Sequence, residues 1–218
     1  MEHTTPSTTK DAVAIQKNMR KHVILRDEFE EVKTLVGIDV GYDLKNNMSK
    51  CALVLMDADS LEIKQSVIAH EESPFPYISG LLSFREAPVI LKALSVLGKK
   101  PDLLMIDGQG VAHPRRLGIA AHIGVLTDLP AIGVAKSRLC GHYDEPPPSK
   151  GAHTPLTDKG EYIGTVLRSR DNVKPLFISA GHKISQETAL KWVINSLWKY
   201  RLPEPTRLAD KLSKYHKG

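Results

Sequence analysis

The apolar run LLMID, residues 103–107, constrains the fold of this chain more than any other stretch, because it ends in a carboxylate before Gly-Gln-Gly. A short apolar run bounded by turn residues is typical of a buried strand. A helical pattern follows over 115–128, and a second apolar run, AIGVAK, occupies 131–136. Two buried strands joined by a helix predict a parallel pair with a crossover connection, and therefore an α/β fold.

The segments before this unit predict an antiparallel extension of the same sheet. Three strand-like runs separated by turn residues occupy 34–42, 51–57 and 61–69. Residues 83–97 carry apolar side chains at helical spacing and predict a helix between the third run and 103–107. Outside this central part, the patterns predict a helix over 11–25 capped by Thr9, a loop over 144–153, strands over 161–169 and 174–181, and a helix over 185–198.

This order of elements predicts a ribonuclease H-like architecture. It comprises a mixed five-stranded central sheet flanked by helices, with C-terminal additions, and its first and fourth strands are parallel neighbours. The 218 residues suit one domain, 1–218, better than two, and 41% hydrophobic residues suffice for a full core. No apolar run approaches the length of a membrane span.

The polar N-terminal stretch and the low cysteine content indicate a cytoplasmic protein. The N-terminal stretch MEHTTPSTTK is polar and lacks the apolar segment of a secretory signal. Cys51 and Cys140 belong to no metal-ligand spacing, so both are expected to be reduced thiols.

Positive charge gathers in a basic tail that begins at about residue 199. The formal charge of the chain is +5, and residues 199–218 hold six lysines and arginines against two acids, a net +4. A solvated chain end and a surface for a polyanion such as nucleic acid both fit this charge. We expect the tail to be only weakly helical.

Three carboxylates are expected at one edge of the sheet. Asp39 lies late in the first strand and Asp107 ends the fourth, so parallel neighbouring strands would bring the two together. Glu86 opens the helix between them. Each acid also has an ordinary explanation, a turn residue for the aspartates and a helix N-terminal acid for Glu86. Neighbouring carboxylates repel each other unless a cation lies between them, and oxygen ligands suit Mg²⁺ or Mn²⁺.

A dinucleotide site is the competing interpretation of the same turn. Gly108 and Gly110 supply two glycines of a G-x-G-x-x-G pattern between a strand and a helix. The third position is His113, whose side chain would obstruct close packing of the helix on the strand. Asp128 precedes the next strand instead of ending it, which places it badly for a ribose. The metal interpretation is therefore preferred.

Four blocks of sequence resemble the signature blocks of the endonuclease V family, in order and at fitting spacing. They are VGIDVGY, PYISGLLSFRE, PDLLMIDGQGVAHPRRLGIAAHIGVLTDLPAIGVAKSRLCG and ISAGHKIS, which span about residues 34 to 198. The resemblance implies a ribonuclease H-like, Mg²⁺-dependent or Mn²⁺-dependent endonuclease. Such an enzyme nicks nucleic acid at the second phosphodiester bond 3′ to hypoxanthine, the base of deoxyinosine and inosine.

The resemblance also implies the roles of particular residues. The metal ligands would be Asp39, Glu86 and Asp107. His182 would be an active-site histidine, and Lys136 would lie near the phosphate that is cut. Without the resemblance, His182 would be assigned to a helix start and Lys136 to a strand end at the surface.

A wedge and a base pocket complete the implied site. Tyr77, on a proline-flanked loop, would enter the base stack when the target base is flipped out. A tyrosine packed on the sheet edge is the ordinary alternative. The extruded base would lie among six residues, namely Gly80, Leu82, Gly108, Gly110, His113 and Leu139.

Together with this resemblance, the sequence leads us to expect a monomeric, Mg²⁺-dependent endonuclease that acts on deoxyinosine in DNA, in DNA repair. Two alternatives stay open: an inosine-specific endoribonuclease, and a nucleic-acid-binding protein of the same fold that no longer cuts. The intact set of three acids argues against the second.

Overall fold

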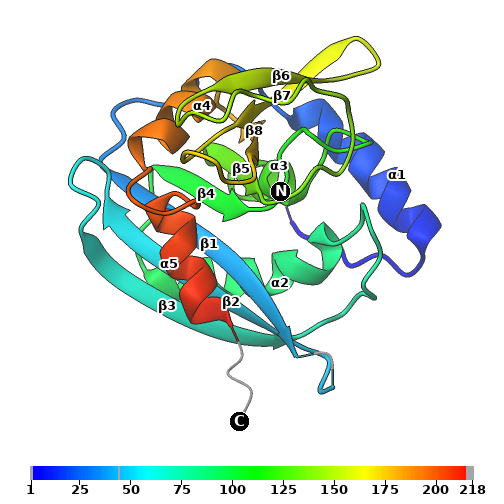
Figure 1. Cartoon of the computed structure of the whole chain (residues 1–218). Helices are drawn as coiled ribbons and strands as arrows, with labels where there is room; N and C mark the ends of the chain where they lie inside the picture. Colours follow the sequence, from blue (N-terminus) through cyan, green and yellow to red (C-terminus); the bar gives the residue numbers. More distant parts are fainter. Residues whose placement is uncertain (1, 44, 215–218) are drawn as a thin grey trace.

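The computed structural model describes residues 2–43 and 45–214, and within them the strands form one eight-stranded sheet in the order β3-β2-β1-β4-β5-β8-β7-β6 (Figure 1). The strands are β1 (Thr34–Asp43), β2 (Met48–Asp57), β3 (Ile63–Glu72), β4 (Leu103–Asp107), β5 (Ala131–Ala135), β6 (His153–Asp158), β7 (Glu161–Leu167) and β8 (Leu176–His182). The helices are α1 (Thr9–Met19), the short 3-10 helix η1 (Arg20–His22), α2 (Ser83–Leu97), α3 (Ile119–Thr127), α4 (Gln186–Asn195) and α5 (Glu204–Ser213).

The predicted five-stranded arrangement is confirmed as the core of this sheet. Strand β1 pairs antiparallel with β2 and parallel with β4, from Leu35 opposite Leu103 to Ile38 opposite Ile106. The sheet does not stop at β5, because β8 pairs antiparallel with the free edge of β5 and carries β7 and β6 beyond it. Strand β6 has no counterpart in the prediction.

The boundaries of α2 and β4 agree with the prediction, whereas those of the other four helices differ. Helix α1 ends at Met19 instead of residue 25, and α4 ends at Asn195 instead of residue 198. Thr8, not Thr9, caps α1, because its side chain accepts a hydrogen bond from the backbone N–H of Asp11. Helix α3 begins only at Ile119, after a turn in which Arg116 adopts a φ of +56°. The tail expected to be weakly helical contains α5, a regular helix that packs on β1 and β2.

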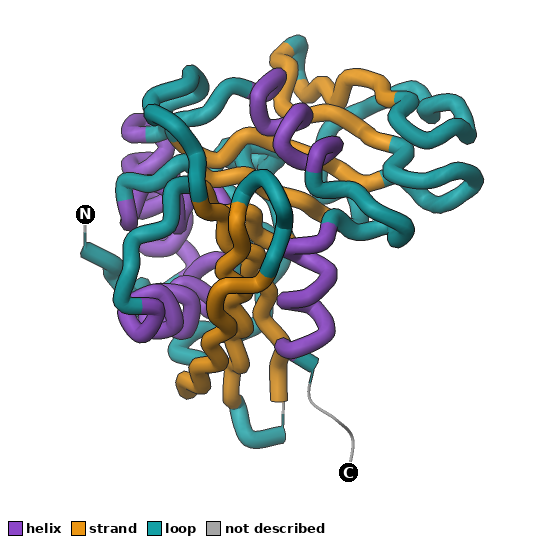
Figure 2. Tube along the Cα trace, turned by 90° about the vertical axis from the view of Figure 1, so that its left-hand side faces the viewer, coloured by secondary structure: helices purple, strands orange, loops and turns teal. Residues whose placement is uncertain are grey.

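Helices cover both faces of the sheet, as Figure 2 shows from the side. Successive side chains of a strand point to opposite faces. On one face, Val36 and Ile38 of β1 join a core formed with α2 and α3. On the other face, Leu35 joins the core under α4. Among the described residues, no helix is long and apolar enough to cross a membrane.

Helix α5 approaches β1 closely because two glycines leave room for its backbone. A Cβ atom at Gly37 would lie 2.0 Å from the carbonyl oxygen of Pro205, and one at Gly41 would lie 2.3 Å from that of Ser213. Asp39, midway between the two glycines, points to the same face of the sheet. The sequence Gly-Ile-Asp-Val-Gly therefore brings α5 to the carboxylate of Asp39.

We expect Gly37→Ala to destabilise the protein by about 1–3 kcal/mol. The new methyl group would overlap the backbone of Pro205, so α5 would have to move away from β1. Urea unfolding measures this loss, and limited proteolysis should show earlier cleavage within 204–214. Gly160→Ala is the control, because it changes a glycine with a φ of +80° that has nothing within 4 Å of its Cβ position. The alanine at position 160 would strain the local backbone, but this strain should not expose α5 to protease. Unchanged stability of Gly37→Ala would show that this close approach is not required.

Candidate active site

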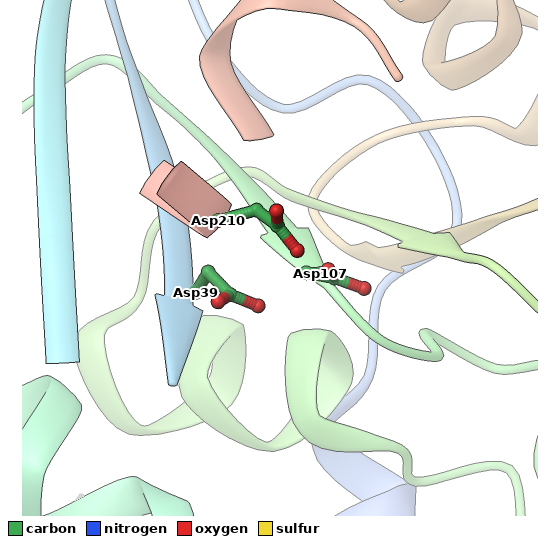
Figure 3. Close-up of side chains that lie close together, drawn as sticks. All are labelled: Asp39, Asp107 and Asp210. Atoms are coloured by element: carbon green, nitrogen blue, oxygen red, sulfur yellow. The ribbon is translucent and has the colours of Figure 1, made fainter. Parts of the chain in front are cut away.

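Three aspartates from distant parts of the chain converge at the carboxyl end of β4 (Figure 3). Asp39 and Asp107 follow Ile38 and Ile106, the last paired residues of β1 and β4, and therefore stand side by side. Asp210 reaches them from the last turn of α5. One carboxylate oxygen of each aspartate lies within 4.8 Å of the others. We call these three residues the aspartate cluster.

Lys136 and Ser213 hold the aspartate cluster together. Lys136 follows β5, and its ammonium group contacts Asp107 and lies 2.6 Å from Oδ1 of Asp210. The hydroxyl of Ser213 donates a hydrogen bond to Asp39. Lys214 also lies 2.6 Å from Oδ2 of Asp210. Two cations therefore face three carboxylates, which leaves a local excess of negative charge.

Burial and mutual repulsion perturb the ionisation of the cluster. Burial, followed by the charge of Asp39, raises the pKa of Asp107 to about 7, although Lys136 acts in the opposite direction. Burial also opposes ionisation of Asp210, but its contacts with Lys136 and Lys214 hold its pKa below the ordinary value. A carboxylate whose pKa is raised by burial and by a like charge is stabilised when another cation enters.

Glu86 approaches the same edge from the opposite face, in the first turn of α2. The hydroxyl of Tyr42 donates a hydrogen bond to Oε1 of Glu86. Burial raises the pKa of Glu86 to about 8, and the charges of Asp39 and Asp107 add to the rise. Glu86 is not a member of the aspartate cluster. The charges of Asp39 and Asp107 nevertheless act on it, and it lines the same cavity.

A cavity of about 340 Å³ opens beside the aspartate cluster. Its lining includes Glu86, Asp107 and Lys136. It also includes five of the six residues expected to form a base pocket, namely Gly80, Leu82, Gly108, His113 and Leu139. The structure therefore brings the expected pocket and most of the expected catalytic residues to one place.

Three side chains fix the rim of this cavity at Gly80. The carbonyl oxygen of Gly80 accepts hydrogen bonds from Gln16 at 3.0 Å, from His113 at 2.9 Å and from Arg115 at 2.7 Å. Nδ1 of His113 accepts the backbone N–H of Arg115, so its Nε2 carries the proton. Burial lowers the pKa of His113 to about 4, which keeps this ring neutral.

Tyr77 stands on the loop that leads to this rim. Its side chain is 61% exposed, and its ring meets the ring of Tyr42 edge-on, with centroids 5.9 Å apart. It does not line the cavity. An exposed ring held at one edge beside a cavity can contact a bound molecule.

Gly110 and His182 are not part of this arrangement. Gly110 lies against β8, where a Cβ would be 2.2 Å from the carbonyl oxygen of Ala180, so it serves close packing. His182 pairs with Ala131, at the start of β5, whereas Asp107 pairs with Val134 near its end. Three residues along a strand correspond to about 10 Å.

The contacts of His182 explain its position. Its Nδ1 accepts the backbone N–H of Ile24, and its Nε2 lies 3.4 Å from Asp128. These bonds fasten the segment after α1 to the end of β8. His182 is therefore placed far from the aspartate cluster that it was expected to join.

Two polar residues of the site, Asp210 and Gln109, were not predicted from the sequence. The apolar spacing of Leu208, Ala209 and Leu212 could have indicated an amphipathic helix around Asp210. Gln109 lines the cavity, and its Nε2 donates to the carbonyl oxygen of Ser137 at 2.9 Å. Its Oε1 is buried and accepts no hydrogen bond in the described part of the chain.

Comparisons with known proteins agree with this geometry. The family model for endonuclease V matches residues 17–211. The endonuclease V of Rippkaea orientalis is 53% identical over 208 residues, which cover 95% of this chain and 91% of that protein. The crystal structure of endonuclease V from Streptomyces avermitilis aligns with a TM-score of 0.90 at 41% identity and covers 96% of this chain and 92% of that one.

A third relative has been crystallised with nucleic acid. Endonuclease V of Ciona intestinalis, in complex with a 24mer DNA containing an inosine followed by a ribo-adenosine, aligns with a TM-score of 0.79 at 31% identity. The alignment covers 92% of this chain and 93% of that one. The fold, the aspartate cluster and these matches together show that the chain belongs to the endonuclease V family.

Proposed function

We propose that this protein is a metal-dependent endonuclease that recognises hypoxanthine in DNA and hydrolyses the second phosphodiester bond 3′ to it, as a step of DNA repair. The observation that carries the proposal is the aspartate cluster beside a cavity of about 340 Å³. The complex of the Ciona relative with inosine-containing DNA supports the choice of base. The position of the cut rests on the resemblance to the family.

The residues present fit a divalent cation. Asp39, Asp107 and Asp210 offer oxygens within 4.8 Å of one another, and burial together with repulsion keeps the pKa of Asp107 near 7. Such a hard, all-oxygen donor set suits Mg²⁺, with Mn²⁺ as a substitute. We assign Glu86 to the same ligand group from the opposite face of the sheet. When bound, the cation supplies an activated water and offsets the charge of the leaving oxygen.

The remaining groups act on the nucleic acid itself. Lys136 is anchored at the end of β5, on the wall of the cavity, and its ammonium group can turn from the carboxylates to a phosphate. Burial depresses its pKa, but Asp107 and Asp210 more than compensate and raise it above the ordinary value. Lys136 therefore stays charged and balances phosphate charge at neutral pH.

Gln109 lines the cavity and carries an acceptor atom that would suit hypoxanthine. The Nε2 atom of Gln109 donates to a carbonyl oxygen, which orients the amide and leaves Oε1 without a hydrogen bond among the described residues. Hypoxanthine carries a proton on N1, whereas adenine presents a lone pair there. We propose that the amide turns on binding, so that Oε1 accepts the N1 proton of hypoxanthine. With adenine the same atom would face a second acceptor, which favours hypoxanthine.

An inosine-specific endoribonuclease is the second candidate. A ribo-adenosine follows the inosine in the DNA bound by the Ciona relative, which favours a site that tolerates a ribose next to the target. Matched DNA and RNA substrates separate the two candidates. We further propose that the enzyme acts as a monomer in the cytoplasm, where Cys51 and Cys140 would remain the free thiols that the structure contains.

Removal of Asp210 should abolish cutting without unfolding the protein. Asp210→Asn and Asp107→Asn should each lower the single-turnover nicking of a hypoxanthine oligonucleotide by orders of magnitude, because each removes a charged ligand. Excess EDTA should do the same to the wild type, and Mg²⁺ should restore it. Asp59→Asn, an exposed acid in the β2–β3 turn, is the matched control and should cut normally. Full activity of Asp210→Asn, or of the wild type in EDTA, would refute the metal assignment.

Tyr77→Ala should weaken binding to a duplex that contains hypoxanthine by about tenfold or more, because base stacking on an aromatic ring is worth roughly 1–3 kcal/mol. The loss should be smaller for single-stranded substrate, where less stacking must be replaced. Gel-shift affinities measure both effects. Tyr162→Ala removes a tyrosine that is 54% exposed on β7 and serves as the control. If Tyr77→Ala binds and cuts the duplex like the wild type, Tyr77 is a packing residue and no wedge.

A further inference from the structure

Two aromatic rings lie exposed in the connection between α4 and α5. The side chain of Trp198 is 64% exposed and that of Tyr200 is 42% exposed. Cations interleave with these rings. Nζ of Lys199 lies 5.0 Å from the centroid of the Trp198 ring and 5.8 Å from that of Tyr200. The guanidinium of Arg207 lies 4.4 Å from the Tyr200 centroid. We call residues 198–201 together with Arg207 the aromatic–basic strip.

More positive charge surrounds the strip. The ammonium group of Lys150 donates to the carbonyl oxygen of Trp198 at 3.4 Å. Nε of Arg201 donates to the carbonyl oxygen of Lys174 at 2.8 Å, which brings that exposed lysine to the same surface. Among the described residues, Glu204, which is buried against Arg207, is the acid that forms an ion pair with the strip. Cations therefore outnumber acids around the two rings.

The strip is connected to the aspartate cluster through Lys136. Nη2 of Arg201 donates to the carbonyl oxygen of Lys136 at 2.9 Å, and the ammonium group of Lys136 contacts Asp107 and Asp210. Arg201 is three residues from Trp198, so their Cα atoms are at most about 11 Å apart. A few nucleotides span that distance. A strand that passes the cluster can therefore continue onto the two rings.

Exposed aromatic rings between cations match one class of ligand best. A single nucleic-acid strand presents both π-faces for stacking and phosphates for ion pairing, and its binding sites combine these two features without reading sequence. An acidic peptide would satisfy the cations but would leave both rings in water. The combination of exposed rings and cations is therefore best matched by unpaired nucleotides.

We propose that the aromatic–basic strip is a binding site for single-stranded nucleic acid that flanks the cleavage site. Bases stack on Trp198 and Tyr200, Lys199 pairs with phosphate, and Arg207 supports the Tyr200 ring from behind. Arg201 positions the strip against the end of β5. The inference rests on the proposed function for its place beside the cut, and it adds a contact surface outside the base pocket.

Tryptophan fluorescence tests the stacking directly. In a Trp192→Phe variant, Trp198 is the single tryptophan, because the chain contains two. Undamaged oligo-dT of twelve nucleotides should quench its fluorescence in a saturable, salt-sensitive manner. An abasic oligonucleotide of equal length should bind through its phosphates with little quenching. Absence of quenching by oligo-dT that is bound, as judged by the anisotropy of a labelled strand, would overturn the proposal. Equal quenching by polyglutamate would also overturn it.

Flank length tests the place of the strip beside the cut. The double variant Trp198→Ala/Tyr200→Ala should bind a single-stranded hypoxanthine oligonucleotide with ten-nucleotide flanks about tenfold or more weakly than the wild type. With two-nucleotide flanks the loss should be much smaller. Trp198→Phe/Tyr200→Phe should retain most of the affinity, and Tyr162→Ala all of it. Equal losses at both lengths, or none, would overturn the proposal.

The same experiments keep this inference separate from the proposed function. If the wild type cuts hypoxanthine substrates but the strip variants bind like the wild type at both lengths, the strip is refuted and the function stands. If the wild type cuts no hypoxanthine substrate while oligo-dT still quenches Trp198, the function is refuted and the strip stands as a nucleic-acid site.

Discussion

The close contact of α5 with β1 is the interaction on which the site depends. Gly37 and Gly41 have no side chains, so the helix backbone comes within van der Waals distance of the strand on either side of Asp39. That approach brings Asp210 to two carboxylates that the sheet has already placed side by side. The repulsion among three acids has to be offset, and Lys136 offsets part of it. The remaining negative charge gives the site its demand for a cation.

The cavity proposed as the base pocket depends on a second fixed point, the carbonyl oxygen of Gly80. Gln16 of α1 and His113 of the turn after β4 both donate to it, so the first helix and the catalytic edge of the sheet hold one loop. The low pKa of His113 keeps its donor proton on Nε2 in neutral solution. Tyr77 stands outside this rim and does not line the cavity, so the proposed steps of base recognition and hydrolysis rest on different residues. The two steps can therefore be altered independently by mutation.

Local patterns in the sequence were sufficient for the sheet core and for Asp39 and Asp107, because strand order and register follow from apolar runs and crossovers. They were not sufficient for Asp210, which lies 103 positions after Asp107 in a segment dominated by positive charge. The position of Asp210 depends on Gly37 and Gly41 of β1, which leave room for the backbone of α5. The two glycines in the sequence do not indicate which helix packs against them. His182 was assigned to the active site from its motif alone. Because β8 runs antiparallel to β5, His182 lies opposite Ala131, at the other end of β5.

The central claim is that Asp39, Asp107 and Asp210 form one divalent-metal site. A crystal structure of the protein grown with Mn²⁺ tests it most directly, because anomalous scattering at the manganese edge locates the ion without reference to activity. The account predicts an anomalous peak with an oxygen of each of the three aspartates in its coordination shell, and its loss in crystals of Asp210→Asn. A peak elsewhere, or an ion bound to Asp39 and Asp107 with Asp210 still paired to Lys136, would contradict it.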